Sequence, residues 1–380
     1  LFLPYVALAY AEATGDASIW DVSVPYLQDK PIPEGARDLY CAMEEGEKQE
    51  PIYLHCARAI ECTLAFGPHG LPLMGDGDWN DGMDRVGEDG GESVWLGMFL
   101  VDVLSRFAPI AAQRGDDVRA AHYTASIEQL RAALEEAGWD GAWYRRAYFA
   151  NGESLGSRGS AACAIDLLSQ AWAAICGLPH AQEAFDSAMA LLVNRENGLV
   201  RLLAPPFERP DANVGYISNY LAGVRENGGQ YTHAAAWLLR AACLLKKADC
   251  AQELFSMLNP ISHADSTFSM RRYKAEPYVL AGDVYAVGRN AGRGGWTWYT
   301  GAAGWLYTVV LSDVLGVVRR GERLFVSPCT QFSEYTVRYR FGSAVYAITV
   351  RGGAQGPQDG IPLVDDGLIH NLLIEPGEAT

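Results

Sequence analysis

The sequence lacks the cysteine and histidine patterns that build common metal and redox centres. Its 380 residues include eight cysteines, but no CxxC pair and no cysteine–histidine group with zinc-ligand spacing. Most of the cysteines lie in apolar stretches such as AACLLKKADC, which is typical of buried free thiols in a reducing compartment. We therefore expect free thiols, no bound metal and a cytoplasmic location.

Long apolar runs are missing as well. We find no stretch that approaches the ~18–20 apolar residues needed to span a bilayer. The N-terminal segment LFLPYVALAYAEATGD is apolar, but it has no basic region before it and contains an early proline, so it does not match a signal peptide. Because it lacks an initiator methionine and its pattern indicates the middle of an amphipathic helix, we interpret the chain as part of a longer protein.

Basic residues are scarce relative to acidic ones. The 30 Lys and Arg residues against 46 Asp and Glu residues give a net charge of −16. A chain this acidic repels a phosphate backbone, which excludes nucleic acid from the expected partners. The HExxH, GxGxxG and Walker A signatures are also absent. The 19 Tyr, 10 Trp and 12 Phe residues suit a carbohydrate-binding cleft, although most of them are needed to fill a large core.

Helical periodicity dominates the chain up to about residue 316. The pattern predicts helices over 53–66, 92–107, 116–137, 161–176, 181–193, 230–246, 248–257 and 299–316. In the helix over 116–137 we expect one buried face made of Val118, Ala121, Ile127, Leu130 and Leu134. Four long loops separate the helices, and loops of this length are usually functional. They cover 67–91, 138–160, 195–229 and 258–298.

The periodicity changes from 3.6 to 2 at about residue 322. FSEYTVRYRFGSAVYAITVRG predicts a β-hairpin around a Gly-Ser turn, and PLVDDGLIHNLLIE predicts another hairpin or strand pair. The sequence thus predicts a mainly α protein, with a helical domain over 1–317 and a small antiparallel β-sandwich-like module over 318–380. Successive helical hairpins with loops on one side indicate an (α/α)6 barrel, incomplete at its N-terminal end. An α-solenoid is the alternative, but the chain shows no regular repeat of about 34–47 residues.

The first candidate site segment is LPLMGDGDWNDGMDRVG, residues 71–87. It has four aspartates within nine residues, beside Trp79: Asp76, Asp78, Asp81 and Asp84. One interpretation is a carboxylic general acid next to an aromatic platform for a sugar ring. A calcium loop is a second, although no glutamate stands at the twelfth position and the glycine is misplaced. A turn that only caps the next helix is a third, and it explains the tryptophan and the glycines poorly.

Two further segments carry candidate ligand-binding groups. RENGGQYTHAAAW, residues 225–237, turns on two glycines and enters a helix at His233. Glu226 and His233 are seven residues apart, about two turns if the helix begins early. GRGGWTWYTGAAGW, residues 292–305, places Thr300 before an apolar helix whose first N–H groups could bind an anion. A core histidine and a simple N-cap are the structural alternatives for these two segments.

Five blocks in this order resemble the C-terminal half of glycoside hydrolase family 94, the inverting β-glucoside phosphorylases: LMGDGDWNDGMDRVG, GESVWLGMFL, RENGGQYTHAAAW, EPYVLAGDVY and GRGGWTWYTGAAGW. The sequences of these blocks are most similar to the C-terminal phosphorylase-like domain of cyclic β-1,2-glucan synthases and to 1,2-β-oligoglucan phosphorylases. The resemblance covers nearly the whole chain. It implies an (α/α)6 barrel that carries β-sandwich modules.

The resemblance also implies roles for individual residues. Asp81 corresponds to the general acid, and Trp79 lies in the sugar subsite. His233, Thr300 and Gly301 correspond to the phosphate pocket. Phosphate would then act as co-substrate and nucleophile, with no other cofactor, and a β-glucan oligosaccharide would yield α-glucose 1-phosphate. An inverting phosphorylase of this kind needs only the acid, since phosphate replaces the water that a second carboxylate would activate.

Further substrate contacts are expected from Asp78, Arg225, Glu226 and Gln230. The chain departs from the family pattern where EPYVLA is followed by Gly282, because some members have a phosphate-binding Gln there. The family also draws a phosphate-binding Arg from a region upstream of this chain, and Arg225 and Arg293 are candidates to replace it. We consider two further partners. One is a glycosyltransferase region in the same polypeptide, which would tether the domain to the inner membrane. The other is a second copy of the chain, which would form a homodimer.

Two other functions remain open from the sequence. An inverting hydrolase on the same fold would need a second catalytic carboxylate, with Asp78, Asp84 and Glu226 as candidates. A non-catalytic glucan-binding module would keep Trp79 and tolerate the substitution Asp81→Asn.

Overall fold

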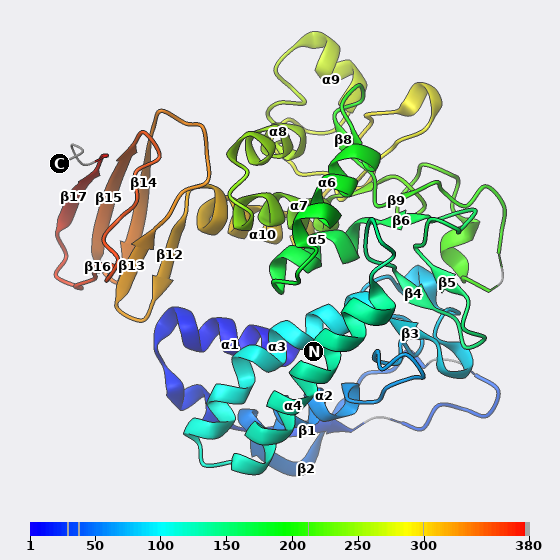
Figure 1. The fold of residues 1–380 in the computed structure, drawn as a ribbon. Coiled ribbons are helices and arrows are strands. Elements are labelled where there is room, and N and C mark those ends of the chain that lie inside the picture. Colours follow the sequence, from blue (N-terminus) through cyan, green and yellow to red (C-terminus); the bar gives the residue numbers. More distant parts are fainter. Residues whose placement is uncertain (29, 37–38, 212, 299, 377–380) are drawn as a thin grey trace.

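The computed structural model describes residues 1–28, 30–36, 39–211, 213–298 and 300–376, except the side chain of the residue at 300. Helices are its main regular structure, and the chain ends in a group of strands (Figure 1). The helices are α1 (Phe2–Thr14), α2 (Ile52–Thr63), α3 (Val94–Gln113), α4 (Asp117–Ala133), α5 (Leu167–Ile175), α6 (Ala181–Leu191), α7 (Thr232–Leu244), α8 (Ala248–Leu258), α9 (Thr267–Tyr273) and α10 (Thr300–Val309).

All eight predicted helices are present, with boundaries that differ from the predicted ones by a few residues in most cases. Ser93 caps α3 and Asp166 caps α5, each through a side chain that accepts a backbone N–H. Helix α9 was not predicted, nor was the pair of strands β1 (Ser23–Gln28) and β2 (Glu44–Pro51). Both lie in polar stretches where hydrophobic periodicity is weak.

The predicted buried face of α4 is only partly correct. Leu130 and Leu134 are buried, but Val118 is 83% exposed and Ala121 is exposed too. The helix contacts α3 along a narrow strip through Tyr123 and Leu130, and residues at 118 and 121 lie one position off this strip. Tyr123, which the prediction omitted, is fully buried.

Helix α3 corrects the expectation that no segment could span a membrane. By length and composition alone, Val94–Gln113 is apolar enough to do so, with a mean hydropathy of 1.5. However, 67% of that window is buried within the protein, and a core helix passes the same test. Packing therefore accounts for its apolar sequence.

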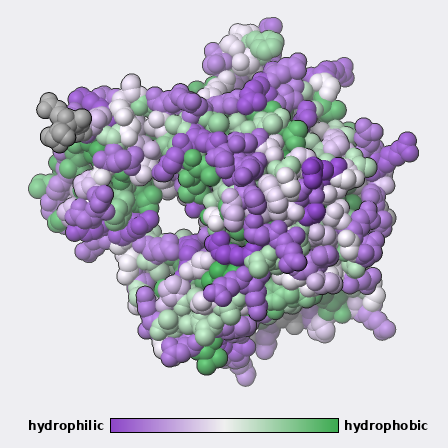
Figure 2. Space-filling view, in the orientation of Figure 1, coloured by the Kyte–Doolittle hydropathy of each residue, from purple (hydrophilic) through white to green (hydrophobic). Residues whose placement is uncertain are grey.

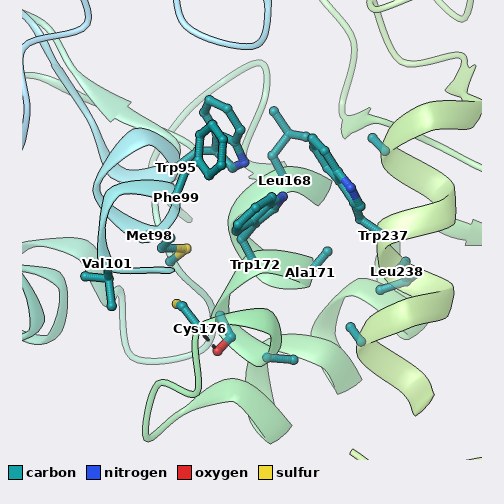
Figure 3. Packing of buried hydrophobic residues seen from close by; sticks show 14 of the residues in the cluster. Trp95, Met98, Phe99, Val101, Leu168, Ala171, Trp172, Cys176, Trp237 and Leu238 are labelled. Carbon is teal, nitrogen blue, oxygen red and sulfur yellow. Dashed lines mark hydrogen bonds between the residues drawn. The ribbon is translucent and has the colours of Figure 1, made fainter. Parts of the chain in front are cut away.

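Aromatic residues from three helices form the centre of the core (Figure 3). Trp95 and Phe99 of α3 face Trp172 of α5 and Trp237 of α7. Ring centroids lie 5.1 Å apart for Phe99 and Trp172, 5.2 Å for Trp172 and Trp237, and 6.2 Å for Trp95 and Trp237. This cluster fixes α3, α5 and α7 against one another beneath their N-terminal loops.

Short strand pairs cross-link those loops. They are β3 (Glu92–Ser93), β4 (Ala147–Tyr148), β5 (Ser154–Leu155), β6 (Ile165–Asp166), β7 (Val193–Asn194), β8 (Leu199–Val200), β9 (Leu203–Ala204), β10 (Gln230–Tyr231) and β11 (Asp283–Val284). The pairings are β3–β4–β5, β6–β9, β7–β8 and β10–β11. Several directly precede α3, α5 and α7, so the loops are held at the N-terminal ends of these core helices.

The C-terminal part has two three-stranded sheets around a separate apolar cluster. The strands are β12 (Val317–Arg320), β13 (Arg323–Val326), β14 (Glu334–Phe341), β15 (Ala344–Arg351), β16 (Ile361–Pro362) and β17 (Ile369–Ile374). The predicted hairpin is confirmed as β14–β15. The second predicted pair is wrong, because β16 joins β13 and β17 runs parallel to β15, so the module is not wholly antiparallel. Figure 2 shows an opening between this module and the helices.

None of the eight cysteines, all of which lie in the described residues, forms a disulfide, as predicted. Cys56, Cys163, Cys176, Cys243 and Cys329 are buried, which agrees with their apolar sequence context. Cys62, by contrast, is exposed at the end of α2.

Candidate functional site

The loop between α2 and α3 presents Asp81 at the surface. The side chain of Asn80 accepts the N–H of Gly82 at 3.0 Å and so starts a short 3-10 turn, Asp81–Met83. Met83 is buried under this turn, whereas Asp81 is exposed. The turn thus directs one carboxylate outward over an apolar base.

The other aspartates of this loop have separate roles. Asp78 is completely buried in an ion pair with Arg146, and Asp84 Oδ1 accepts the N–H of Tyr216 at 3.1 Å. The prediction that Asp78 contacts a sugar is therefore wrong. Asp76 is exposed. Because these carboxylates diverge, the loop does not form a calcium cage, and no group of three metal-ligating side chains occurs among the described residues.

Two tyrosines from the loop before α7 stand near Asp81. The rings of Tyr216 and Tyr220 make an edge contact, with centroids 6.0 Å apart. Burial raises the pKa of Tyr216 to about 12, and the charges of Asp81 and Glu226 add to this effect. Two aromatic rings and the Asp81 carboxylate are therefore close together on this side of the protein.

The turn before α7 differs from its prediction in two respects. The helix begins only at Thr232, so Glu226 lies in the preceding turn and not two helical turns below His233. Gln230 is 2% exposed, and its side chain accepts the N–H of Val200 at 2.9 Å. It also donates to Thr232 Oγ1 at 3.1 Å. The predicted substrate contact of Gln230 is wrong, since its amide cross-links the backbone.

His233 and Trp79 are joined by a hydrogen bond. Trp79 Nε1 donates to His233 Nδ1 at 3.3 Å, because an indole nitrogen can only donate. Burial lowers the pKa of His233 to about 4, so the ring is neutral at pH 7. With Nδ1 accepting, the proton must reside on Nε2. His233 Nε2 is buried and has no partner within the described structure, which leaves a free N–H donor.

A cavity of about 100 Å³ lies beside this imidazole. It is lined by Arg225, Tyr231, His233, Gly282, Asp283, Trp296, Gly301 and Ala302. The guanidinium of Arg225 lies over the Trp296 ring, 3.2 Å from its centroid, and Nε is 3.7 Å from Glu226 Oε2. Arg225 is thus the cation of the cavity.

Glu226 and Asp283 supply negative charge at the same place. Burial raises the pKa of each carboxyl group, although Arg225 opposes the shift in both. Asp283 Oδ1 accepts the N–H of Trp296 at 2.7 Å. Burial raises the pKa of Tyr231 to about 12, and the charges of Glu226, Asp283 and Asp81 contribute. Asp81 therefore lies within electrostatic reach of the residues around the cavity.

The remaining predicted residues are placed as follows. Gly301 lines the cavity at the first turn of α10, and a Cβ there would meet nothing within 4 Å. Thr300 is the first residue of α10, but its side chain lies outside the described part of the structure. Arg293 is exposed and does not line the cavity, so the structure favours Arg225 over Arg293 as its cation.

Sequence reasoning missed Tyr216, Tyr220, Asp283, Trp296 and Arg146. Trp296 and Asp283 stood in motifs that were noted, but nothing in those motifs showed which side chains face the cavity. Tyr216 and Tyr220 lie in a loop with no recognisable pattern. Only their position near Asp81 in the structure identifies them as candidate site residues.

Comparison with known proteins shows the family to which this chain belongs. Residues 3–316 match the family model described as the glycosyl hydrolase 94 superfamily, catalytic domain. The cyclic β-(1,2)-glucan synthase NdvB of Rhizobium meliloti (strain 1021) is 41% identical over 96% of this chain, which spans 13% of that protein. The solabiose phosphorylase of Paenibacillus borealis is 27% identical over 97% of this chain and 48% of its own length.

A solved sialidase structure has a TM-score of 0.53 at 11% identity, over 76% of this chain and 27% of that one, and shows similarity of fold only. The chain spans less than half of the curated relatives named above. The family match nevertheless extends over most of its residues, and the identity to the synthase is substantial. This chain therefore belongs to the glycosyl hydrolase 94 superfamily, whose catalytic domain it carries at residues 3–316.

Proposed function

We propose that this chain is a phosphorylase domain that cleaves β-1,2-glucosidic bonds with inorganic phosphate and inverts the anomeric centre. The observation that carries the proposal is the unpaired Nε2–H of His233, which lies beside a cavity of about 100 Å³. A buried donor without a partner is costly unless a ligand satisfies it. Trp79 links this donor directly to the loop of Asp81.

The proposed reaction uses two groups on opposite faces of the sugar. Asp81 gives its proton to the glycosidic oxygen as the bond from C1 to that oxygen breaks. A phosphate oxygen forms the new bond to C1 from the other face, which gives α-glucose 1-phosphate and a glucan shorter by one unit. No second carboxylate is needed, because phosphate is already a nucleophile and no water has to be deprotonated.

The cavity offers suitable donors for phosphate. The neutral imidazole of His233 donates through Nε2, and Arg225 supplies the positive charge. Gly301 lies in the first turn of α10, where backbone N–H groups and the helix dipole favour an anion. We expect Thr300 to contribute there as well. These contacts would offset the negative charge of Glu226 and Asp283.

The finer features of the proposal rest on the relatives. The name of the synthase from Rhizobium meliloti points to a β-1,2-linked glucan. We propose the same linkage here, and a place for this domain within a larger synthase at the cytoplasmic side of the inner membrane. We also propose that the helices belong to an (α/α)6 barrel. Association into a homodimer is part of the same proposal.

Hydrolysis is a second candidate because of Glu226. Its side chain is 14% exposed, its Oε2 has no hydrogen-bond partner in the described structure, and it lies within electrostatic reach of Asp81. Such a carboxylate could activate water in an inverting hydrolase.

One assay separates the two functions. The protein, as its gene encodes it, is incubated with β-1,2-glucooligosaccharides with and without phosphate, and the products are quantified. Phosphorolysis predicts α-glucose 1-phosphate that forms only when phosphate is present. Free glucose formed at the same rate without phosphate would contradict phosphorolysis and favour hydrolysis. Cleavage in neither condition would exclude both enzymes and favour a glucan-binding module.

Replacing His233 by alanine tests the cavity itself. We expect the KM for phosphate to rise about 10- to 100-fold, because a hydrogen bond to a charged group contributes about 1.5–3 kcal/mol. The KM for the glucan should change little. The matched control is His180→Ala, since His180 stacks on Trp139 and does not line the cavity. An unchanged phosphate KM in His233→Ala would refute this assignment.

A further inference from the structure

A fully buried arginine connects the loop of Asp81 to the helical core. Arg146 donates from Nη1 to Asp78 Oδ2 at 2.6 Å and from Nη2 to Asp78 Oδ1 at 2.5 Å, and both side chains are 0% exposed. Ser93 Oγ donates to Asp78 Oδ2 at 2.6 Å, and the N–H of Asn80 donates to Oδ1 at 3.0 Å. Both oxygens of the carboxylate are thus occupied, three residues before Asp81.

The same cluster reaches the N-termini of two core helices. Ser93 Oγ also accepts a backbone N–H of α3 at 2.9 Å, and Asp166 accepts one of α5 at 2.9 Å. Arg146 Nε lies 3.7 Å from Asp166 Oδ1. Since α3 and α5 supply the tryptophans of the central core, Arg146 anchors the loop to its most tightly packed part.

The backbone of Arg146 is held as firmly as its side chain. Its N–H donates to the carbonyl of Leu155 at 2.8 Å, and its carbonyl accepts the N–H of Val94 at 3.2 Å. Gly156 has a φ of +80°, and a Cβ there would lie 2.4 Å from the Arg146 nitrogen. The close approach of these two backbone segments therefore requires glycine at position 156.

A displacement of Asp78 would be passed on to Asp81 through a short hydrogen-bonded path. Asn80, whose N–H is bound to Asp78, accepts the N–H of Gly82 with its side chain at 3.0 Å and that of Met83 with its carbonyl at 3.0 Å. These bonds define the turn that carries Asp81. Changes at Asp78 therefore change the direction of the Asp81 carboxyl group.

We propose that Asp78 and Arg146 form a positioning pair that holds the Asp81 carboxyl group in line with the glycosidic oxygen. This inference rests on the proposed function, in which Asp81 is the proton donor. Neither residue touches the substrate, so both act through Asp81. The expected contribution is large, since a displacement of about 1 Å at a catalytic group can reduce the rate about 100-fold.

Asp78→Asn is a variant that can keep the fold. Removing one partner of a buried ion pair usually leaves an uncompensated charge. Here Arg146 keeps Asp166 as a second carboxylate. Burial raises the pKa of Asp166 to about 6, and the charge of Asp78 adds to that rise, so loss of Asp78 favours ionised Asp166. Asp166→Asn is the matched control, because asparagine can still cap α5 and the Asp78–Arg146 pair remains.

The kinetic test compares two substrates in the protein as its gene encodes it, with phosphate present. A β-1,2-glucooligosaccharide needs a proton on its leaving group, whereas 2,4-dinitrophenyl β-glucoside does not. For Asp78→Asn we expect kcat to fall about 10- to 100-fold on the oligosaccharide and less than about threefold on the aryl glucoside. Asp166→Asn should retain both rates. Equal losses on both substrates, or no loss on the oligosaccharide, would overturn the proposal.

A second measurement does not depend on activity. Hydrogen exchange of the Gly82 and Met83 amides should be at least about tenfold faster in Asp78→Asn than in the wild type and in Asp166→Asn. Unchanged exchange would overturn the positioning role even if the enzyme were active. If the wild type releases only free glucose, the proposed function fails but the substrate comparison still applies, because a hydrolase needs the same donor. If Asp78→Asn does not fold, Arg146→Lys takes its place, since lysine keeps the charge but loses the paired geometry.

Discussion

Replacing Asp81 by asparagine is expected to reduce the phosphorolysis of β-1,2-glucooligosaccharides by about 10²- to 10⁴-fold. Asparagine has nearly the shape of aspartic acid, but it cannot give a proton to the leaving sugar. Asp81 is exposed at the end of a turn, so the substitution leaves the packing of Met83 below it unchanged. The loss should therefore appear in kcat and not in the phosphate KM.

The activated substrate provides the internal comparison for this variant. On 2,4-dinitrophenyl β-glucoside, Asp81→Asn should retain most of the wild-type rate, because that leaving group departs without a proton. Asp76→Asn is the control, since Asp76 is another exposed carboxylate of the same loop. Near-normal phosphorolysis of the oligosaccharide by Asp81→Asn would contradict the role of Asp81 as the proton donor.

Replacing Trp237 by alanine is expected to lower the free energy of unfolding by about 3–5 kcal/mol. Trp237 is fully buried at the meeting point of the core and the site. Its ring lies 5.2 Å from that of Trp172, 4.4 Å from His233 and 5.9 Å from Trp79. Truncation would therefore leave a large cavity that α3, α5 and α7 all border. Urea denaturation followed by circular dichroism would measure the change.

Trp237→Phe is the conservative comparison. The indole Nε1 of Trp237 has no hydrogen-bond partner in the described structure, so phenylalanine loses ring area but no polar contact. We expect a loss of about 1–2 kcal/mol. If alanine and phenylalanine destabilised the protein equally and by less than about 1 kcal/mol, the aromatic cluster would not be the centre of the core.

Local signals in the sequence predicted most of the helices. Hydrophobic periodicity located the eight helices and the change to strands, since both depend on neighbouring residues. It failed for Val118, because the strip of α4 that contacts α3 depends on how the two helices meet. It also failed for β17. This strand pairs in parallel with β15 and not with the strand that precedes it in the sequence.

The candidate site was predicted in part for a similar reason. Asp81, Trp79 and His233 stand in distinctive motifs, and Trp79 and His233 are in contact in the structure. The motif of Asp78 did not reveal its role, because its partner Arg146 is 68 residues away in the chain. Gln230 was mistaken for a ligand contact, since the sequence does not show that its side-chain oxygen already accepts the backbone N–H of Val200.

The central claim is that phosphate, and not water, attacks C1 while Asp81 protonates the leaving oxygen. Oxygen tracing tests it most directly. The reaction is run with phosphate labelled with oxygen-18 at every position in unlabelled water, and the products are examined by mass spectrometry and NMR. The account predicts α-glucose 1-phosphate that retains every labelled oxygen, including the one bonded to C1. Glucose whose C1 oxygen comes from the solvent would contradict it.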